Sequence, residues 1–285
     1  MESSTYRMGY ATSGFAHHRI DDAIALLAEL GYSAISLTLD VVHLDPFSKD
    51  LAAEVNRVRR LLERHKLAVV VETGARFLLD PRRKHRPTLM DDGTKRLDFL
   101  RTALHVARDL GADCMAFWAG ALPSGVDRVE ARRRLVAGCA ATIEEAERCG
   151  IDAAFEPEPG MAIETVAEWR ALDKELGSPK RFGLCLDIGH VLATGEGDPA
   201  TVIRDNASRI FTAAIEDTHR GRHEHLPFGE GHLDVPAVLD ALEAVSYNRI
   251  LSVELSRHAY DAVNVATRAR DVLIGLGAPF RVRQE

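Results

Sequence analysis

The chain has 285 residues, of which 46% are hydrophobic, and a formal net charge of −7 at pH 7. This length allows one large α/β domain or two small ones, and the acidic balance argues against a general nucleic-acid-binding protein. Because the sequence shows no apolar run of the ~18 to 20 residues that span a bilayer, no signal-peptide pattern and no CxxC spacing, we expect a soluble, reducing, cytoplasmic setting without a membrane partner.

Short apolar runs rich in β-branched residues alternate along the chain with longer amphipathic runs. The apolar runs predict strands over residues 6–10, 34–40, 67–73, 113–119, 152–157, 182–187, 210–216 and 249–255. The amphipathic runs predict helices between them, including residues 21–30, 51–65, 94–110 and 129–149. Glycines are placed to end helices at Gly31, Gly111, Gly150 and Gly177.

The succession of strands and helices indicates the fold. Eight βα units in a chain of this length match a (β/α)8 barrel, whose usual size is ~250 residues. The alternative, a doubly wound open sheet, usually has fewer strands and a GxGxxG loop after its first strand, whereas this chain continues with ATSGFAHH. No linker divides the sequence, so we predict an α/β fold with a single TIM-barrel domain over residues 1–285.

The longest irregular stretch, residues 74–93, follows the third predicted strand and contains a basic cluster at residues 82–86. In a barrel, a loop at this position lies over the active site. The cluster has two interpretations, a solvated loop and a lid that contacts an anion. Arginines that could hold a phosphate or carboxylate here are Arg76, Arg82, Arg83 and Arg86.

Three predicted strands end in a carboxylate, at Glu156, Asp187 and Glu254. Catalytic groups of this fold lie at the carboxyl ends of strands, so the three side chains should converge on one mouth and repel one another. A divalent cation would compensate this repulsion: oxygen ligands favour Mg²⁺ or Mn²⁺, and added imidazole admits Zn²⁺, Co²⁺ or Fe²⁺. The structural alternative is that each carboxylate caps the next helix or pairs with an arginine.

Histidines gather in the last third of the chain. Asp187 and His190 stand three residues apart where a strand end curls into a loop, so both can face the mouth. His223 and His225 alternate, which places both imidazoles on one face of an extended segment, a spacing typical of metal ligands. A solvated polar loop is the alternative. Residues 228–231 then predict a tight turn before a helix.

Other strand ends carry weaker signals. Glu72 and Trp118 end the third and fourth predicted strands and would point towards the same mouth. Trp118 offers a flat apolar wall for a sugar ring. Packing is the simpler interpretation for both residues.

The motifs FEPEPG, LDIGH, IEDTHRGRHEHLPFGEGHLD and SVEL, in this order, resemble the sugar phosphate isomerase/epimerase family of xylose isomerase-like TIM barrels. That family is related to D-tagatose 3-epimerase-type enzymes and to apurinic endonucleases. The resemblance extends over essentially the whole chain but specifies the reaction poorly, because fold does not determine function. It implies one divalent metal ion (Mn²⁺, Mg²⁺, Co²⁺ or Zn²⁺), no organic cofactor, and a small-molecule sugar or cyclitol as substrate. Barrels of this kind often pair as homodimers.

The resemblance also implies roles for individual residues. The carboxylate metal ligands are matched by Glu156, Asp187 and Glu254. The catalytic residues would be Glu156, Glu254 and His190. The substrate-binding residues would be His190, Arg220, Trp118 and Glu158.

One position departs from the family pattern. Where the family has a histidine ligand on strand seven, this chain has Ala214, which cannot bind a metal. Either a water or a loop histidine fills the position, or the metal binds weakly or elsewhere. The apurinic endonucleases hold another zinc ion with an Asp-x-His element and the Asp-x-x-His histidine. Because His190, His223 and His225 match those positions, His223 and His225 are further candidate metal ligands.

The sequence therefore predicts a divalent-metal-dependent isomerase or epimerase of a small keto-sugar, sugar phosphate or cyclitol. It would act through an enediolate, with Glu156 and Glu254 moving the proton. Three alternatives remain: a lyase or dehydratase that uses the same site, a non-catalytic ligand-binding descendant, and a zinc phosphodiesterase resembling the apurinic endonucleases. About three zinc ions per chain would favour the last, and about one would not.

Overall fold

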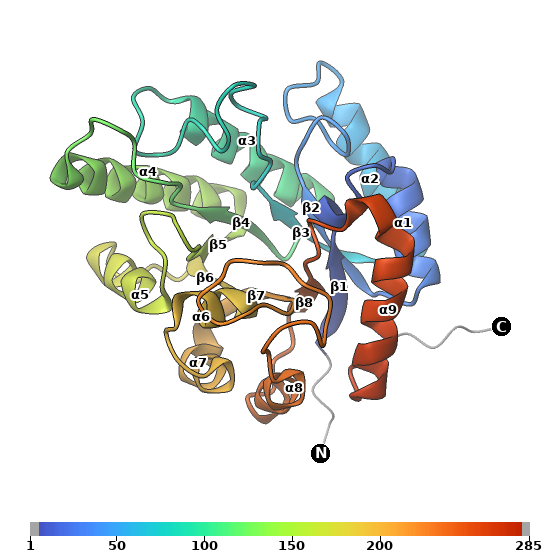
Figure 1. Ribbon diagram of the computed structural model, residues 1–285. Helices are drawn as coiled ribbons and strands as arrows, with labels where there is room; N and C mark the ends of the chain where they lie inside the picture. The colour runs from blue at the N-terminus through green and yellow to red at the C-terminus, as the bar shows by residue number, and fades with distance from the viewer. Residues whose placement is uncertain (1–5, 281–285) are drawn as a thin grey trace.

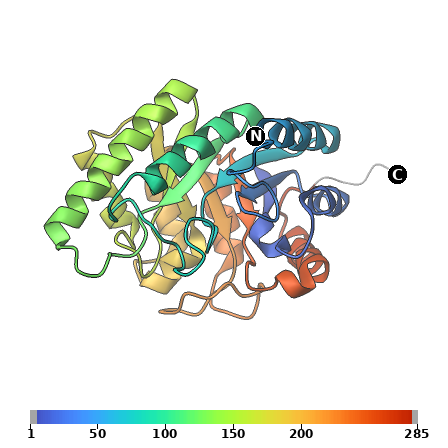
Figure 2. The ribbon, with the colours of Figure 1, turned by 90° about the horizontal axis from the view of Figure 1, so that it is seen from above.

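The computed structural model describes residues 6–280, and these form a closed barrel of parallel strands surrounded by helices (Figure 1). Each strand pairs with the next along the chain, and β8 pairs with β1 through Arg7 to Tyr10. The prediction of a (β/α)8 TIM barrel is confirmed. Viewed at right angles, the helices lie outside the strands on every side that the view shows (Figure 2).

The strands of the barrel, in chain order, are β1 Arg7–Ala11, β2 Ala34–Thr38, β3 Ala68–Glu72, β4 Cys114–Trp118, β5 Asp152–Glu156, β6 Phe182–Asp187, β7 Ile210–Ile215 and β8 Ile250–Val253. The α-helices are α1 Ile20–Glu29, α2 Leu51–His65, α3 Lys95–Leu110, α4 Arg128–Cys149, α5 Val166–Glu175, α6 Ile188–Thr194, α7 Pro199–Asn206, α8 Val235–Ala244 and α9 Ala262–Gly275. Within residues 6–280 no helix combines the length and the apolar character that crossing a membrane requires.

The predicted elements agree with these bounds. Each predicted strand is present with its ends shifted by no more than two residues, and the four helices predicted by range are shifted by one at most. Gly111 and Gly150 end α3 and α4 in the left-handed conformation, at φ 70° and 71°, which glycine adopts at low cost.

Two apolar clusters build the core. The larger lies between the strands and the surrounding helices. The smaller lies inside the barrel, since its members Ala116 and Cys185 also line the cavity at the barrel's end. Phe211 is its one aromatic member, and a Cβ at Gly183 would lie only 2.4 Å from the Phe211 ring. Small members of the same cluster, such as Ala116 and Ala154, leave space for a cavity towards the carboxyl ends of the strands.

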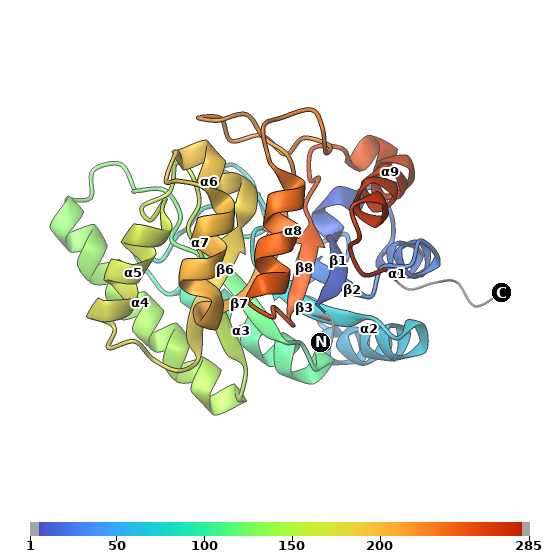
Figure 3. The same ribbon diagram turned by 90° about the horizontal axis from the view of Figure 1, so that it is seen from below.

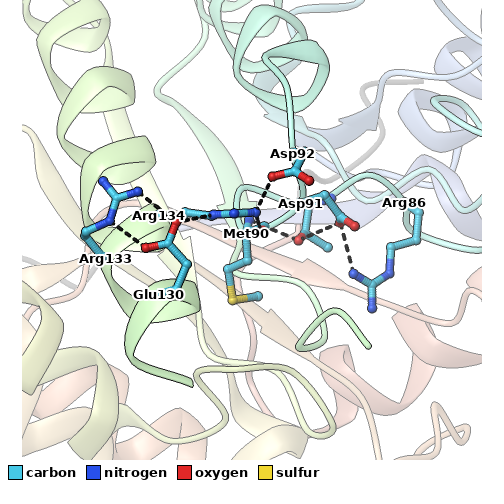
Figure 4. Close-up of polar contacts among 8 residues, drawn as sticks. Arg86, Met90, Asp91, Asp92, Glu130, Arg133 and Arg134 are labelled. Atoms are coloured by element: carbon cyan, nitrogen blue, oxygen red, sulfur yellow. Dashed lines mark hydrogen bonds and ion pairs between the residues drawn. The ribbon is translucent and has the colours of Figure 1, made fainter. Parts of the chain in front are cut away.

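The long connection between β3 and α3 is held against α4. Arg134 of α4 pairs with Asp92 at 2.6 Å and donates to the carbonyl of Met90 at 3.2 Å (Figure 4). Within the connection, Arg86 pairs with Asp91 at 2.9 Å. These contacts fix the part of the loop that precedes α3.

Candidate metal and substrate site

A cavity of about 900 Å³ opens at the carboxyl ends of the strands. Seven of the predicted site residues line it: Trp118, Glu156, Glu158, His190, His223, His225 and Glu254. Ala214 lines it as well. Asp187 is buried at the end of β6, with 2% of its surface exposed. One mouth therefore collects side chains from β4, β5, β6 and β8 and from the loop that follows β7.

Asp187 uses its two carboxylate oxygens differently. Oδ1 accepts a hydrogen bond from the backbone amide of His190 at 3.0 Å and caps α6. Oδ2 is buried, has no hydrogen-bond partner among residues 6–280, and lies 3.3 Å from the imidazole Nε2 of His190. Burial raises the pKa of Asp187, but the positive charges that His190 and His225 carry when protonated, a hydrogen bond with Glu216 and the backbone amide of His190 together outweigh burial and lower it. The side chain therefore caps α6 with Oδ1 and offers Oδ2 as a candidate metal ligand.

The His190 ring is oriented by the backbone. Its Nδ1 lies 3.2 Å from the carbonyl oxygen of Pro157, which can only accept, so Nδ1 carries a proton. In the neutral ring, Nε2 then has the free lone pair. Nε2 faces Oδ2 of Asp187 and, at 3.1 Å, Nε2 of His223. In metal-binding histidines, one ring nitrogen typically donates to a carbonyl or carboxylate while the other binds the metal. The His190 ring has this arrangement.

Glu216 directly follows β7, is fully buried, and was not identified from the sequence. Ligand-type atoms of Asp187, Glu216 and His225 lie within 4.8 Å of one another. Both carboxylate oxygens of Glu216 and Nδ1 of His225 are buried beyond ordinary hydrogen-bond distance of any partner in residues 6–280. Their nearest neighbours are one another and Asp187: Nδ1 lies 3.6 Å from Oε1 of Glu216, and the carboxyls of Glu216 and Asp187 interact. Each such orphaned group costs ~1 to 3 kcal/mol. A divalent cation would satisfy all of these atoms, and their oxygen and nitrogen donors suit Mn²⁺, Co²⁺ or Zn²⁺.

Protonation states around this group follow from its burial. Burial, and next the charge of Asp187, raise the pKa of Glu216 well above its ordinary value. Burial lowers the pKa of His225 to about 3. The imidazole is thus neutral at physiological pH, the state in which it can bind a metal.

Two of the other groups of metal-type side chains share members with this one: Glu156 with Asp187 and His190, and His190 with His223 and His225. Glu254 belongs to no such group in the described part of the chain, although it lines the same cavity. The structure thus brings Glu156 and Asp187 together, and it leaves Glu254 apart from the carboxylate set expected from the sequence.

The segment between β7 and α8 folds back over the mouth. It extends beyond the end of α8 (Figure 3). Asp217 and Leu226 pair as an isolated antiparallel bridge, with both backbone hydrogen bonds at 2.9 Å, and this bridge returns His223 and His225 to the cavity. The bridge explains how two histidines outside any strand reach the site.

Asp217 also organises the rest of this segment. Its carboxylate accepts hydrogen bonds from the backbone amides of Gly229, Gly231 and Leu233, each at 2.9 Å. A Cβ at Gly231 would lie 2.3 Å from Oδ1 of Asp217 and 2.6 Å from backbone atoms of Thr218. The predicted turn at residues 228–231 is therefore wrapped around one buried carboxylate.

Four glutamates give the cavity a strongly acidic character. Burial and then Glu158 raise the pKa of Glu156 well above its ordinary value, and burial and then Glu72 do the same for Glu254. Burial also raises the pKa of Glu158. Glu72 has its pKa raised to about 7, mainly by burial, although the hydroxyl of Thr38 donates to it at 3.2 Å. These carboxyls retain protons near neutral pH unless a cation compensates them.

The basic residues at the mouth differ from those expected. Arg220 is exposed and does not line the cavity, and only its backbone amide makes a described contact, to Nδ1 of His232 at 3.3 Å. The side chains that line the cavity instead are Arg76, Lys84 and Arg257. The structure thus gives no support to Arg220 as a substrate ligand.

Trp118 lies in the wall of the cavity with the guanidinium of Arg96 stacked 4.4 Å from its ring centroid. Arg96 is buried, donates to the carbonyl and hydroxyl of Thr73 at 3.2 Å, and has its pKa lowered to about 9 by burial. This packing holds the indole face in place against the cavity.

Glu216 could have been recognised from strand periodicity, as Glu72 was from its place at a strand end. Glu216 lies two residues beyond Ala214, so both point to the barrel interior. Glu72 ends β3 as Glu156 ends β5. The sequence offers no comparable signal for Arg257, because it lies in a loop whose path depends on the tertiary structure.

Comparisons with known proteins agree with the fold. A family model described as xylose isomerase-like TIM barrel matches residues 24–275. L-ribulose-5-phosphate 3-epimerase UlaE from Escherichia coli is 24% identical over 256 residues, which cover 88% of this chain and 87% of that protein.

Among solved structures, the IolI protein with a bound zinc atom superposes with a TM-score of 0.76 at 16% identity, covering 97% of this chain and 100% of that one. The probable 3-DHS dehydratase AsbF from Bacillus anthracis gives a TM-score of 0.76 at 16% identity, covering 95% and 98%. At these identities the structural likeness shows the fold.

Proposed function

Because the chain belongs to the xylose isomerase-like TIM barrel family, we propose that it is a divalent-metal-dependent isomerase or epimerase of a small polyhydroxy ketone, such as a ketose, a ketose phosphate or a keto-cyclitol. The observation that carries the proposal is a group of buried atoms that can bind a metal and make no hydrogen bond among the described residues. These atoms belong to Asp187, Glu216 and His225 and lie beside an acidic cavity. The similarity to a ketose phosphate epimerase over most of the chain supports the same reaction class.

In this proposal, Asp187, Glu216 and His225 hold the cation. His225 takes over the ligand position that Ala214 vacates, because the bridge between Asp217 and Leu226 brings its imidazole to the end of β7. Glu156 borders the same group through Asp187. When bound, the cation would polarise the substrate carbonyl as a Lewis acid and make the adjacent C–H more acidic.

Glu156 and Glu254 would transfer the proton. Both carboxylates line the cavity, and neither belongs to the group of candidate metal ligands formed by Asp187, Glu216 and His225. One removes the proton from the carbon next to the carbonyl to give the substrate's enediolate, and the other returns a proton to the opposite face. Burial raises the pKa of both groups, which makes each carboxylate a stronger base than an ordinary one.

The remaining residues would orient the substrate. His190 lines the cavity, with Nδ1 fixed on the carbonyl of Pro157 and Nε2 beside His223 and Asp187. The indole of Trp118 supplies an apolar wall beside the carboxylates, the arrangement that suits a sugar ring with one apolar face.

The test is solvent deuterium incorporation into ketose substrates by the metal-loaded protein. Glu156→Gln and Glu254→Gln should each lower the rate of exchange by about 10² to 10⁴-fold, the usual contribution of a general acid or base. Glu230→Gln, at an exposed glutamate of the β7–α8 segment, should leave exchange unchanged. Unchanged exchange in both active-site variants would contradict the mechanism.

A lyase or dehydratase reaction is the second candidate. Glu158 lines the cavity close to Glu156 and carries a raised pKa from burial, so it can supply a proton to a leaving hydroxyl after the same proton abstraction. The structural similarity to a probable dehydratase is compatible with this chemistry. Loss of water from the substrate, seen by mass spectrometry, would favour the lyase over the epimerase.

A further inference from the structure

Three cations lie at the outer edge of the cavity. Arg76 and Lys84 come from the segment between β3 and α3, and Arg257 follows β8. All three are exposed residues that line a cavity whose inner surface carries carboxylates. We call this set, Arg76, Lys84 and Arg257, the cationic rim.

Backbone contacts bring the rim residues together. The amide of His85 donates to the carbonyl of Arg76 at 2.6 Å, which folds the loop back and places Lys84 on the same side as Arg76. Arg257 approaches from β8 and donates to the carbonyl of His223 at 2.7 Å. Burial and His190 are the main causes that lower the pKa of His223 to about 4, and the charges of Arg257 and Lys84 add to them. Two loops far apart in sequence therefore meet beside His223.

The rim cations have few partners. Among residues 6–280, Arg76 and Lys84 make no side-chain hydrogen bond or ion pair, and Arg257 makes only its contact to the His223 carbonyl. The neighbouring arginines differ, because Arg83 pairs with Asp80 at 2.6 Å and Arg86 with Asp91 at 2.9 Å (Figure 4). Arg82 of the same loop makes no described side-chain contact either, but it does not line the cavity, so the unpaired loop cations at the cavity are Arg76 and Lys84.

We infer that the cationic rim binds an anionic group of the substrate, a phosphate or a carboxylate, at the end of the molecule remote from the reacting carbonyl. The inference rests on the proposed function for the reacting end. Guanidinium groups bind both anions through paired hydrogen bonds, and an ammonium adds a point charge. The cavity of about 900 Å³ is large for a single sugar ring, since sites for drug-sized ligands span roughly 300 to 1,000 Å³. With a neutral substrate, the rim cations would have only the charges of Glu158 and Glu254 and the carbonyl of His223 to interact with.

Binding of simple anions tests the rim without turnover. Inorganic phosphate and malonate are titrated calorimetrically into the metal-loaded protein. We expect one of them to bind saturably and Lys84→Gln or Arg257→Gln to weaken that binding by about tenfold or more, the effect of losing one charge-assisted hydrogen bond. Arg82→Gln is the control, because Arg82 is exposed on the same loop and does not line the cavity. Absence of saturable binding, or binding that persists in both rim variants, would overturn the inference.

Turnover then distinguishes the two sources of the anion and separates this inference from the proposed function. Deuterium exchange is compared for pentuloses and hexuloses and their terminal phosphates, and for keto-cyclitols and the matching cyclohexanone carboxylates. We expect kcat/KM to be at least about tenfold higher for one anionic class, with the preference lost in Lys84→Gln. Equal kcat/KM for neutral and anionic pairs would overturn the inference and leave the proposed function standing. A third result would overturn the proposed function alone. In it, the unmodified protein binds the anion and the rim variants do not, but no compound exchanges deuterium.

Discussion

Asp187 contacts His190 through both of its carboxylate oxygens: Oδ1 accepts from the backbone amide at 3.0 Å, and Oδ2 stands 3.3 Å from the imidazole Nε2. One side chain therefore sets the start of α6 with Oδ1 and keeps Oδ2 buried, without a hydrogen bond in the described residues, beside His190. Because the two oxygens have different roles, different substitutions of Asp187 can separate its contribution to stability from its contribution to metal binding.

Asp187→Asn keeps an oxygen that can accept from the His190 amide, whereas Asp187→Ala removes the cap. In metal-free protein, urea unfolding should show the Asn variant to be more stable than the Ala variant by ~0.5 to 2 kcal/mol. Both variants should lose at least tenfold in affinity for Mn²⁺ or Zn²⁺ by titration calorimetry, as metal-site substitutions typically do by ~10 to 100-fold or more. Retained affinity in the Asn variant would remove Asp187 from the ligand set.

His225 is predicted to replace the histidine that the family places on strand seven. His225→Ala should therefore lower metal affinity by at least about tenfold. Ala214 is the register partner of Asp187, so a histidine introduced there would reach the same oxygen. Metal titration of the double variant Ala214→His with His225→Ala should show affinity restored towards that of the unmodified protein.

The control for this prediction is His219→Ala. His219 lies on the same segment and its Nδ1 contacts Glu224 at 2.8 Å, away from the cavity lining. Its loss should leave affinity unchanged. A double variant as weak as His225→Ala alone would mean that the cation is held elsewhere.

Glu72 should make the metal-free protein less stable as the pH rises. Its pKa is raised from 4.5 to about 7, mainly by burial, so the folded state holds the proton more tightly than the unfolded state. The resulting stabilisation is present below pH 4.5 and is lost as the pH rises from 4.5 through 7. Glu72→Gln cannot ionise and escapes this loss. Its unfolding free energy, relative to the unmodified protein, should be about 1 to 3 kcal/mol higher at pH 8 than at pH 4.5.

Urea unfolding at the two pH values measures this difference, and Glu230→Gln serves as an exposed control. A free-energy difference for Glu72→Gln that is the same at both pH values would show that folding does not raise the pKa of Glu72.

Gly231→Ala should release the β7–α8 segment from the barrel. The added Cβ would lie 2.3 Å from Oδ1 of Asp217, and the backbone of Thr218 leaves no alternative space. Losing the amide contacts to Asp217 should cost ~1 to 3 kcal/mol and speed hydrogen exchange at Gly229 and Leu233. Gly275→Ala is the matched control, because a Cβ there meets nothing within 4 Å. Equal exchange in both variants would contradict the role assigned to Asp217.

The barrel could be predicted from the sequence because each strand and helix carries its own local pattern. β3, with the sequence AVVVE, and β6, with FGLCLD, are short apolar runs that end in a carboxylate, and the intervening helices show one apolar face. Closure of the barrel followed from the number of βα units. The bridge between Asp217 and Leu226 could not be predicted, because it is a long-range pairing within a segment of mostly polar residues.

The sequence predicted the placement of the candidate site residues at strand ends, but not of those on loops. Glu156, Glu158, His190 and Glu254 line the cavity as expected from their places at strand ends. Arg220 does not reach it, and Lys84 and Arg257 do, because loop paths depend on contacts that no local pattern encodes. Glu254 belongs to no group of close ligand-type atoms among the described residues, and its place at a strand end did not reveal this.

Anomalous diffraction from crystals of the Zn²⁺-loaded protein tests the proposed metal centre most directly. We expect a strong peak about 2.0 to 2.2 Å from Oδ2 of Asp187 and from Nδ1 of His225, the distances of zinc to carboxylate and imidazole ligands. Fully loaded crystals with no peak within coordination distance of Asp187 would contradict a metal centre at this strand end.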